Sequence, residues 1–212
     1  MINKYIDYIQ DPNDTYQTYL EKAKTYNVRC IFAEEDQLEQ TRAFLQDSDI
    51  IIAGAIDFPE GKMPLDEKLN EFKRYATLGY KEIDYVLNQE NIENRNFDAI
   101  LDELVQVAYF CKQHNIVDKA IVEMCKLDET SKEKVCQLAN IAKPVFLKTS
   151  TGRSFGGATL EDVKLMRKTL DNQIQIKAAG GIRTYQDAKS FVEAGANALG
   201  ASAAIAIIEG EK

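Results

Sequence analysis

The sequence has little of several residue types that build common catalytic and metal sites. Its 212 residues include no tryptophan, four prolines, four cysteines and one histidine. A zinc site built on histidines needs more than one of them, and a Ser-His-Asp triad would have to use this single histidine. Both kinds of site are therefore disfavoured. His114 follows a helix-like stretch and precedes an asparagine, so we interpret it as a solvated helix end. We therefore expect no metal and no other cofactor.

The cysteines and the hydrophobic runs set further limits. No Cys-x-x-Cys motif occurs among Cys30, Cys111, Cys125 and Cys136. No run approaches the roughly 18 apolar residues of a membrane span, and no apolar segment of the signal-peptide kind follows residues 1–4. These features predict a cytoplasmic protein with no membrane partner.

Charge and composition indicate which partners are excluded and whether the chain folds as a domain. Thirty-four acidic residues against 26 basic ones give a net charge of -8, which argues against nucleic acid as a partner. The chain is 45% hydrophobic and 28% charged, as a folded domain is. At this length a chain buries roughly 70% of the surface that it exposes when unfolded, so burial alone can hold the fold. We predict one domain over residues 1–212.

Short apolar, β-branched runs alternate with longer segments of helical period. The predicted strands cover residues 4–8, 28–33, 50–56, 82–87, 120–124, 144–148, 174–177 and 198–200. The predicted helices cover residues 15–26, 37–45, 64–78, 97–114, 131–141, 159–170 and 184–194. Strict alternation implies a parallel sheet, and eight such units nearly exhaust the chain. The α/β fold class expected is therefore a single-domain (β/α)8 TIM barrel, with an open sheet as the alternative if residues 4–8 are not a strand.

Three of the predicted strands carry charges that a core strand does not normally contain. The strands of a parallel sheet are covered by helices and are normally apolar. Three of them are interrupted here by a charged residue, namely Asp84, Lys148 and Lys177. An unpaired buried charge costs several kcal/mol, so such residues are either paired with each other for structure or functional. Lys148 and Lys177 end neighbouring strands, at the rim where barrel enzymes carry out their chemistry. That position favours a functional role.

Two adjacent lysines suggest a particular chemistry. Two ammonium groups about 6 Å apart repel by roughly 3 kcal/mol at an effective dielectric constant near 20, which lowers one lysine pKa by about two. The freed amine can condense with a carbonyl to form a Schiff base, and Asp84 can shuttle protons. The residues predict a metal-independent carbonyl lyase.

Glycine-rich segments follow the last three predicted strands. They are TSTGRSFGG at residues 149–157, AAGGIRT at 178–184 and GASA at 200–203, the last opening a short helix. Barrels often bind phosphate with such backbone N–H groups. We assign Gly180 and Gly181 to phosphate binding and interpret Gly156 and Gly157 as ordinary turn glycines.

These segments carry a family resemblance. EID at residues 82–84 with Asn88, LKTSTG at 147–152, GATLEDV at 157–163 and KAAGGIRT at 177–184 occur in family order. On them the chain resembles the deoxyribose-phosphate aldolase family. These are class I aldolases that interconvert 2-deoxy-D-ribose 5-phosphate with acetaldehyde and D-glyceraldehyde 3-phosphate in deoxyribonucleotide catabolism.

The resemblance implies a role for each matching residue. Lys148 would form the Schiff base, Lys177 would tune it, Asp84 would act as acid and base with water, and Asp7 would orient Lys177. The phosphosugar substrate would be bound by Thr151, Gly152, Gly180, Gly181 and Ser202. The chain departs from the family pattern at Ile9 and Met124, where threonines are usual, which affects substrate orientation and efficiency.

Two other functions are compatible with these residues. One is a related phosphosugar aldolase or transaldolase-like barrel with a different substrate and a single lysine. The other is a non-catalytic barrel that binds a sugar phosphate. The combination of Asp84, Lys148 and Lys177 weighs against the second. The assembly state stays open, with a homodimer as one option.

Overall fold

The computed structural model describes residues 1–211, in which strands and helices alternate. The strands are β1 (Ile6–Tyr8), β2 (Cys30–Phe32), β3 (Ile51–Ile56), β4 (Glu82–Val86), β5 (Val117–Ile121), β6 (Phe146–Lys148), β7 (Gln175–Ala179) and β8 (Ala198–Ala201). The α-helices are α1 (Tyr16–Tyr26), α2 (Leu38–Leu45), α3 (Leu65–Leu78), α4 (Gln89–Glu93), α5 (Phe97–His114), α6 (Glu129–Ala142), α7 (Leu160–Thr169), α8 (Tyr185–Glu193) and α9 (Ala204–Glu209). Short 3-10 helices are η1 (Ile2–Tyr5), η2 (Glu35–Gln37) and η3 (Met124–Lys126).

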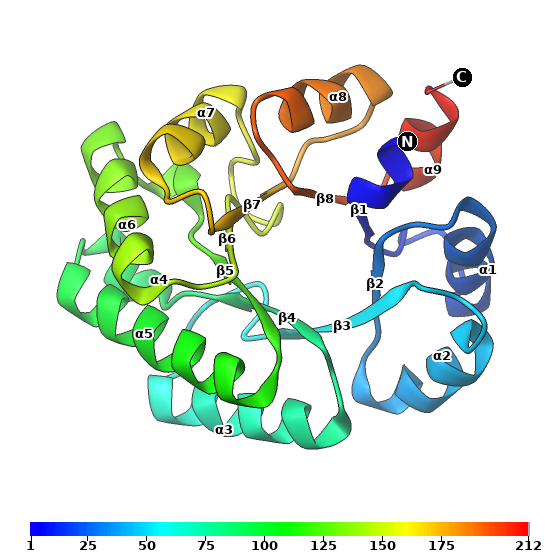
Figure 1. Cartoon of the computed structure of the whole chain (residues 1–212), viewed down its shortest axis with the longest axis horizontal. Helices are drawn as coiled ribbons and strands as arrows, with labels where there is room; N and C mark the ends of the chain where they lie inside the picture. The colour runs from blue at the N-terminus through cyan, green and yellow to red at the C-terminus, as the bar shows by residue number, and fades with distance from the viewer. Residues whose placement is uncertain (212) are drawn as a thin grey trace.

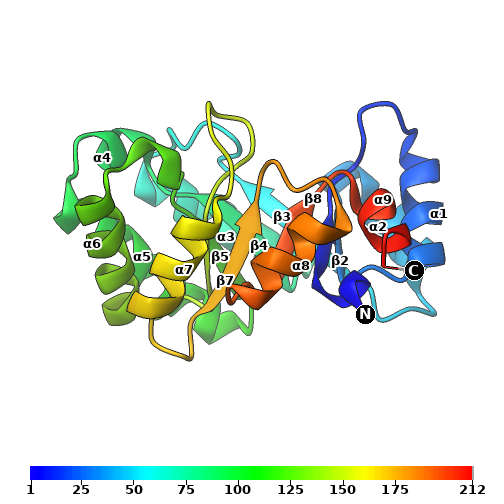
Figure 2. The same ribbon diagram turned by 90° about the horizontal axis from the view of Figure 1, so that it is seen from above.

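All strands run parallel and close into a barrel in sequence order, with β8 paired to β1. The helices surround the strands (Figure 1), and the view from above shows them along the outside of the sheet (Figure 2). The first and last segments, η1 and α9, lie side by side, and the backbone N–H of Ile2 donates to the carboxylate of Glu211. The predicted TIM barrel is therefore confirmed, and the open-sheet alternative is wrong.

Several strand boundaries differ from the prediction by a few residues, and two of these differences have a clear cause. The chain enters β1 at Ile6, because residues 2–5 form a 3-10 turn. Strand β5 begins at Val117, three residues before the predicted start at Ala120. Asp118 and Lys119 precede the apolar run, yet both are buried, so the strand begins before its apolar residues do.

Threonines cap the starts of α7 and α8. The hydroxyls of Thr159 and Thr184 accept from the backbone N–H groups of Asp162 and Asp187, and the second pair forms the full reciprocal capping box. Gly79 ends α3 in the left-handed conformation (φ 84°), as expected of a glycine after a helix.

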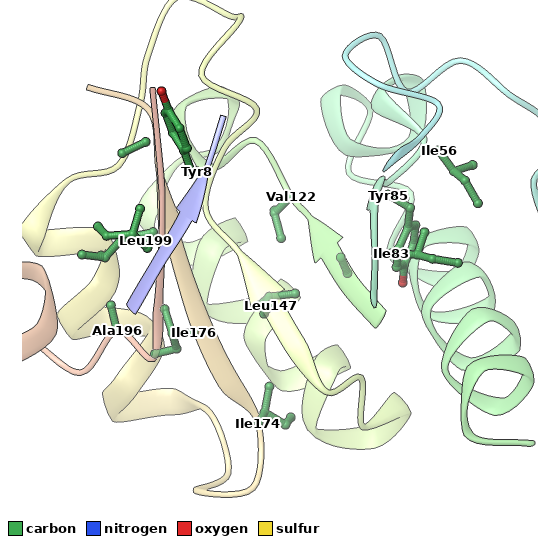
Figure 3. Close-up of a cluster of buried hydrophobic side chains, with 14 of the residues drawn as sticks. Tyr8, Ile56, Ile83, Tyr85, Val122, Leu147, Ile174, Ile176, Ala196 and Leu199 are labelled. Carbon is green, nitrogen blue, oxygen red and sulfur yellow. The ribbon is translucent and has the colours of Figure 1, made fainter. Parts of the chain in front are cut away.

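The hydrophobic core lies between the barrel and its helices. Because side chains alternate along a strand, Ile83, Tyr85, Leu147, Ile176 and Leu199 point outward to the helix layer (Figure 3), and all five are fully buried. The intervening residues point into the barrel, and these include the charged ones. The outer layer supplies the burial that holds the fold, which leaves the interior free to carry polar chemistry.

Asp118 is a buried carboxyl on the outward face of β5. One oxygen accepts from the backbone N–H of Val145 at 3.0 Å, while the other has no hydrogen-bond partner. Burial raises the pKa of Asp118 to about 6 from 3.8. Between these two pH values the folded protein binds more protons than the unfolded chain, so this group makes the fold less stable as pH rises.

We expect Asp118→Asn to stabilise the protein at neutral pH. The amide keeps the acceptor for Val145 and carries no charge, which removes a cost of about 3 kcal/mol implied by the raised pKa. Urea unfolding of both proteins checks this at about pH 4 and about pH 8, where the difference should grow from under about 1 to about 3 kcal/mol. A difference that does not change with pH would contradict it.

Candidate active site

Four residues predicted from the sequence meet inside the barrel. Asp84 Oδ2 accepts from Lys148 Nζ at 2.8 Å and from Lys177 Nζ at 2.7 Å. Lys177 Nζ also lies 2.7 Å from Asp7 Oδ2, on β1. All four side chains are almost completely buried. The parallel register places Lys148 beside Lys177 on β6 and β7, so one carboxylate oxygen is shared by two amines.

Three further charged residues, which the sequence analysis did not select, complete this network. Lys119 on β5 lies 2.6 Å from Glu82 Oε2, 3.1 Å from Asp84 Oδ1 and 3.4 Å from Asp7 Oδ2. Arg29, immediately before β2, contacts Glu82 and Asp7. Glu82 and Asp84 lie two residues apart and therefore on one face of β4, and the register pairs Asp84 with Lys119 on β5. The adjacent charges of Asp118 and Lys119 in VDKAI follow no such alternation, so the sequence carries no clear signal for Lys119.

The pKa values follow from burial and neighbouring charge. Burial alone raises the pKa of Asp84, but the attraction of Lys119, Lys148 and Lys177 outweighs it and holds that pKa well below its usual range. Burial also raises the pKa of Asp7, and Lys177, Lys119 and Arg29 again lower it. Both groups are therefore carboxylates at neutral pH and can accept protons.

The amine of Lys148 has a lowered pKa. Burial lowers its pKa most, Asp84 raises it and Lys177 lowers it, with a result of about 8 against an ordinary 10.5. The sequence argument attributed the lowering to repulsion between the two lysines. The structure gives burial as the larger cause and Lys177 as a smaller one.

Lys148 and Asp84 line a cavity of about 270 Å³ at the carboxyl end of the strands. Phe58, in the loop after β3, lies over the amine with its ring centre 5.6 Å from Lys148 Nζ. Phe32 and Ile9 also line this cavity. Lys177 and Asp7 do not line it. Of the two lysines, Lys148 is therefore the one that a substrate can reach.

A second cavity of about 230 Å³ brings together the residues predicted to bind phosphate. It is lined by Thr151, Gly152, Gly180, Gly181 and Ser202, together with two arginines that the prediction had not assigned, Arg153 and Arg183. Both cavities share Ile9, Gln10 and Arg153. One extended ligand can therefore occupy both, with its charged end among the glycines.

Thr151 and the nearby Gly157 also have structural roles. The hydroxyl of Thr151 donates to Glu123 Oε2 at 2.5 Å and accepts from the backbone N–H of Arg153, which fixes the loop. Gly157 is not an ordinary turn glycine, because a Cβ there would lie 2.5 Å from the carbonyl oxygen of Gly180. The two loops need this close approach to form one wall of the cavity.

Asp7, Cys30 and Glu82 also lie close enough together to share a metal ion. Their carboxylates are already paired, Asp7 with Arg29 and Lys177, and Glu82 with Arg29 and Lys119. Burial raises the pKa of Cys30 far above neutrality, so the thiol is protonated and a poor metal ligand. The donor set does not fit a cation.

Comparison with known proteins places the chain in a family. No family model matches it. It is 39% identical to deoxyribose-phosphate aldolase of Streptococcus sanguinis over 100% of this chain and 97% of that protein. It is 38% identical to the enzyme of the same name from Caldanaerobacter subterraneus, over 98% of this chain and 92% of that one.

A solved structure agrees with these relatives. The deoxyribose phosphate aldolase of Aeropyrum pernix, described as having a unique tetrameric structure, superposes with a TM-score of 0.85 and 25% identity. The match covers 98% of this chain and 89% of that one. With the identity to curated relatives over nearly the full length, this agreement shows that the chain belongs to the deoxyribose-phosphate aldolase family.

Proposed function

We propose that this family member reversibly cleaves 2-deoxy-D-ribose 5-phosphate to acetaldehyde and D-glyceraldehyde 3-phosphate through an imine on Lys148. The observation that carries the proposal is a buried lysine with a lowered pKa, facing a cavity that continues into a glycine- and arginine-lined anion site. The nucleophile and the phosphate site are thereby joined by one cavity, as a phosphorylated aldehyde requires.

The uncharged Lys148 amine attacks C1 of the open-chain sugar, and loss of water gives an iminium ion. A base then takes the proton of the C3 hydroxyl, and the C2–C3 bond breaks with its electrons moving into the iminium. This releases D-glyceraldehyde 3-phosphate. The remaining two-carbon enamine is protonated at C2 and hydrolysed, which releases acetaldehyde and restores the amine.

Asp84 fits the acid–base role, acting with water, because its low pKa keeps it a carboxylate and it contacts the Lys148 amine directly. Lys177 tunes Lys148 through the oxygen that both amines share, and Asp7 holds Lys177 from the other side. Gly152, Gly180, Gly181 and Ser202 bind the phosphate at C5, and Thr151 shapes their loop.

Arg153 and Arg183 supply positive charge to the same site, in a chain whose net charge is -8.

Among residues 1–211, no helix combines the length and the apolar character that a membrane crossing needs. A cytoplasmic location and a homodimer stay predictions from the sequence. Sedimentation velocity measures the assembly state, for which a tetramer is the precedent named in a relative.

Borohydride trapping tests the proposed intermediate. Incubation with 2-deoxy-D-ribose 5-phosphate and sodium borohydride should add an ethyl group, about 28 Da, to the Lys148 peptide. Parallel incubations with other phosphorylated aldehydes and ketoses test the alternative substrates. A protein that binds the sugar phosphate but forms no adduct would instead be a non-catalytic barrel.

The pH dependence provides a separate check. Because only the unprotonated amine attacks and the pKa of Lys148 is lowered to about 8, kcat/KM should rise with pH through a midpoint near pH 8 and level off about one pH unit above it. Initial rates measured across the neutral and alkaline range, with folding followed by circular dichroism, give the midpoint. A midpoint near the ordinary lysine value of 10.5 would show that the site does not lower the pKa of the nucleophile.

A further inference from the structure

We propose that Arg29, at the opposite end of the barrel from the substrate cavity, is a positioning residue that balances the charge of the barrel interior and so favours the uncharged form of Lys148. The inference rests on the proposed function of Lys148 and extends it to a residue that no substrate touches. Arg29 precedes β2 and therefore lies at the amino end of the strands, whereas the cavity lies at their carboxyl end.

The contacts of Arg29 are those of a fixed group. Its Nη1 and Nη2 atoms donate to the two carboxylate oxygens of Glu82 at 3.0 and 2.8 Å, and its Nε donates to Asp7 Oδ1 at 2.7 Å. Such a bidentate pair defines the position of the guanidinium as well as its charge. The Arg29 side chain is 17% exposed, so it closes the amino end of the barrel.

A continuous series of ion pairs links Arg29 to the nucleophile. Arg29 binds one oxygen of Asp7, and Lys177 binds the other at 2.7 Å. Lys177 then donates to the Asp84 oxygen that also accepts from Lys148. Each carboxylate in this series is shared between cations. Removal of one cation therefore increases the negative charge that the remaining cations must balance.

The charges within the barrel balance only when Lys148 is neutral. The carboxylates in this network are Asp7, Glu82 and Asp84. Besides Lys148, the cations that contact them are Arg29, Lys119 and Lys177. Three negative charges therefore face three positive ones, and a protonated Lys148 would add an unbalanced buried charge, which is costly in a low-dielectric interior.

Other groups facing Lys148 do not alter this balance. The cavity that it lines is also lined by Arg153 and Glu34, one charge of each sign. Tyr19 lines the same cavity, and burial raises its pKa well above neutrality, as it does for the Cys30 thiol on β2. Both stay neutral at neutral pH.

Loss of Arg29 should therefore favour the protonated form of Lys148. Three carboxylates would then face two other cations, and protonation of Lys148 would restore neutrality. A unit charge about 10 Å away at an effective dielectric constant near 20 shifts a titration midpoint on the order of one pH unit. The cavity itself would be unchanged.

The test measures the titration midpoint of Lys148 in charge-changing variants. Arg29→Met should raise the midpoint by about one pH unit, and Glu82→Gln, which removes a negative charge with little change of shape, should lower it. The double variant Arg29→Met with Glu82→Gln restores the balance and should return close to the parent midpoint. Arg29→Lys should stay near the parent, because it keeps the charge.

Two readouts separate this inference from the proposed function. The pH profile of kcat/KM and of borohydride trapping requires catalysis, whereas competitive labelling with acetic anhydride, quantified on the Lys148 peptide, gives the midpoint without substrate. Arg74→Met is the matched control, since it removes an arginine charge from the exposed face of α3 and should leave the midpoint unchanged. Thermal unfolding monitors the fold of each variant.

The opposite signs of the two single variants exclude a merely structural role for Arg29. If Arg29→Met does not fold, the fall in Glu82→Gln and the return in the double variant still decide the question. An unchanged midpoint in Glu82→Gln, or a double variant that stays shifted, would overturn the inference. Failure of the parent to form an adduct, with the labelling midpoints moving as expected, would instead contradict only the proposed function.

Discussion

Replacement of Lys148 by alanine should reduce cleavage of 2-deoxy-D-ribose 5-phosphate by about four orders of magnitude or more and abolish imine trapping. No other group facing the cavity supplies the electron sink for C2–C3 cleavage. The variant should fold, because the carboxylates of the barrel interior keep an equal number of cations without Lys148. Three cations still face Asp7, Glu82 and Asp84.

Steady-state rates and mass spectrometry of the borohydride-treated protein measure both effects. Lys164→Ala, on the exposed face of α7, is the matched control and should keep parental activity and labelling. An adduct on Lys177 in the parent protein, with Lys148 unlabelled, would reverse the assignment of the nucleophile. Appreciable turnover by the alanine variant would exclude the mechanism.

The barrel could be predicted because its strands differ from its helices in period and length. Residues 50–56 form a short apolar run, while residues 64–78 and 97–114 follow a helical period. Such an alternation of short and long segments is compatible with few topologies. The start of strand β5 was predicted wrongly because two consecutive charged residues in VDK do not indicate a buried strand. The partners of these two charges come from other strands or loops, Val145 for Asp118 and Glu82 for Lys119, and the sequence does not show them.

The site was predicted in part for the same reason. Asp84, Lys148 and Lys177 stood out as charges in apolar strands, and the glycine loops after β6 and β7 were recognisable as candidate anion sites. The contacts across the barrel were not predictable, because they depend on which strands face one another once the sheet closes. Arg29 illustrates the limit, since it stands before its strand and resembles a surface arginine until Glu82 and Asp7 are placed beside it.

The phosphate should contribute a large part of catalysis although it lies away from the reacting carbonyl. Binding energy from the glycine-lined cavity can position C1 against Lys148, so unphosphorylated deoxyribose should lose about 30- to 1000-fold in kcat/KM, equivalent to about 2 to 4 kcal/mol. Comparison of the two sugars under the same conditions measures this effect. Equal efficiency would mean that the cavity does not recognise phosphate.

Ser202→Asp should weaken the preference for the phosphorylated sugar. Ser202 is exposed and lines the anion cavity, so a carboxylate there would repel the phosphate while leaving the Lys148 amine in place. We expect kcat/KM for the phosphorylated sugar to fall by about 10-fold or more, and that for plain deoxyribose to change little. Thr77→Asp adds the same charge on the exposed face of α3 and should leave both values near the parent. If both sugars lose equally in Ser202→Asp, Ser202 has a structural role and the phosphate is held by Gly180, Gly181 and the two arginines without it.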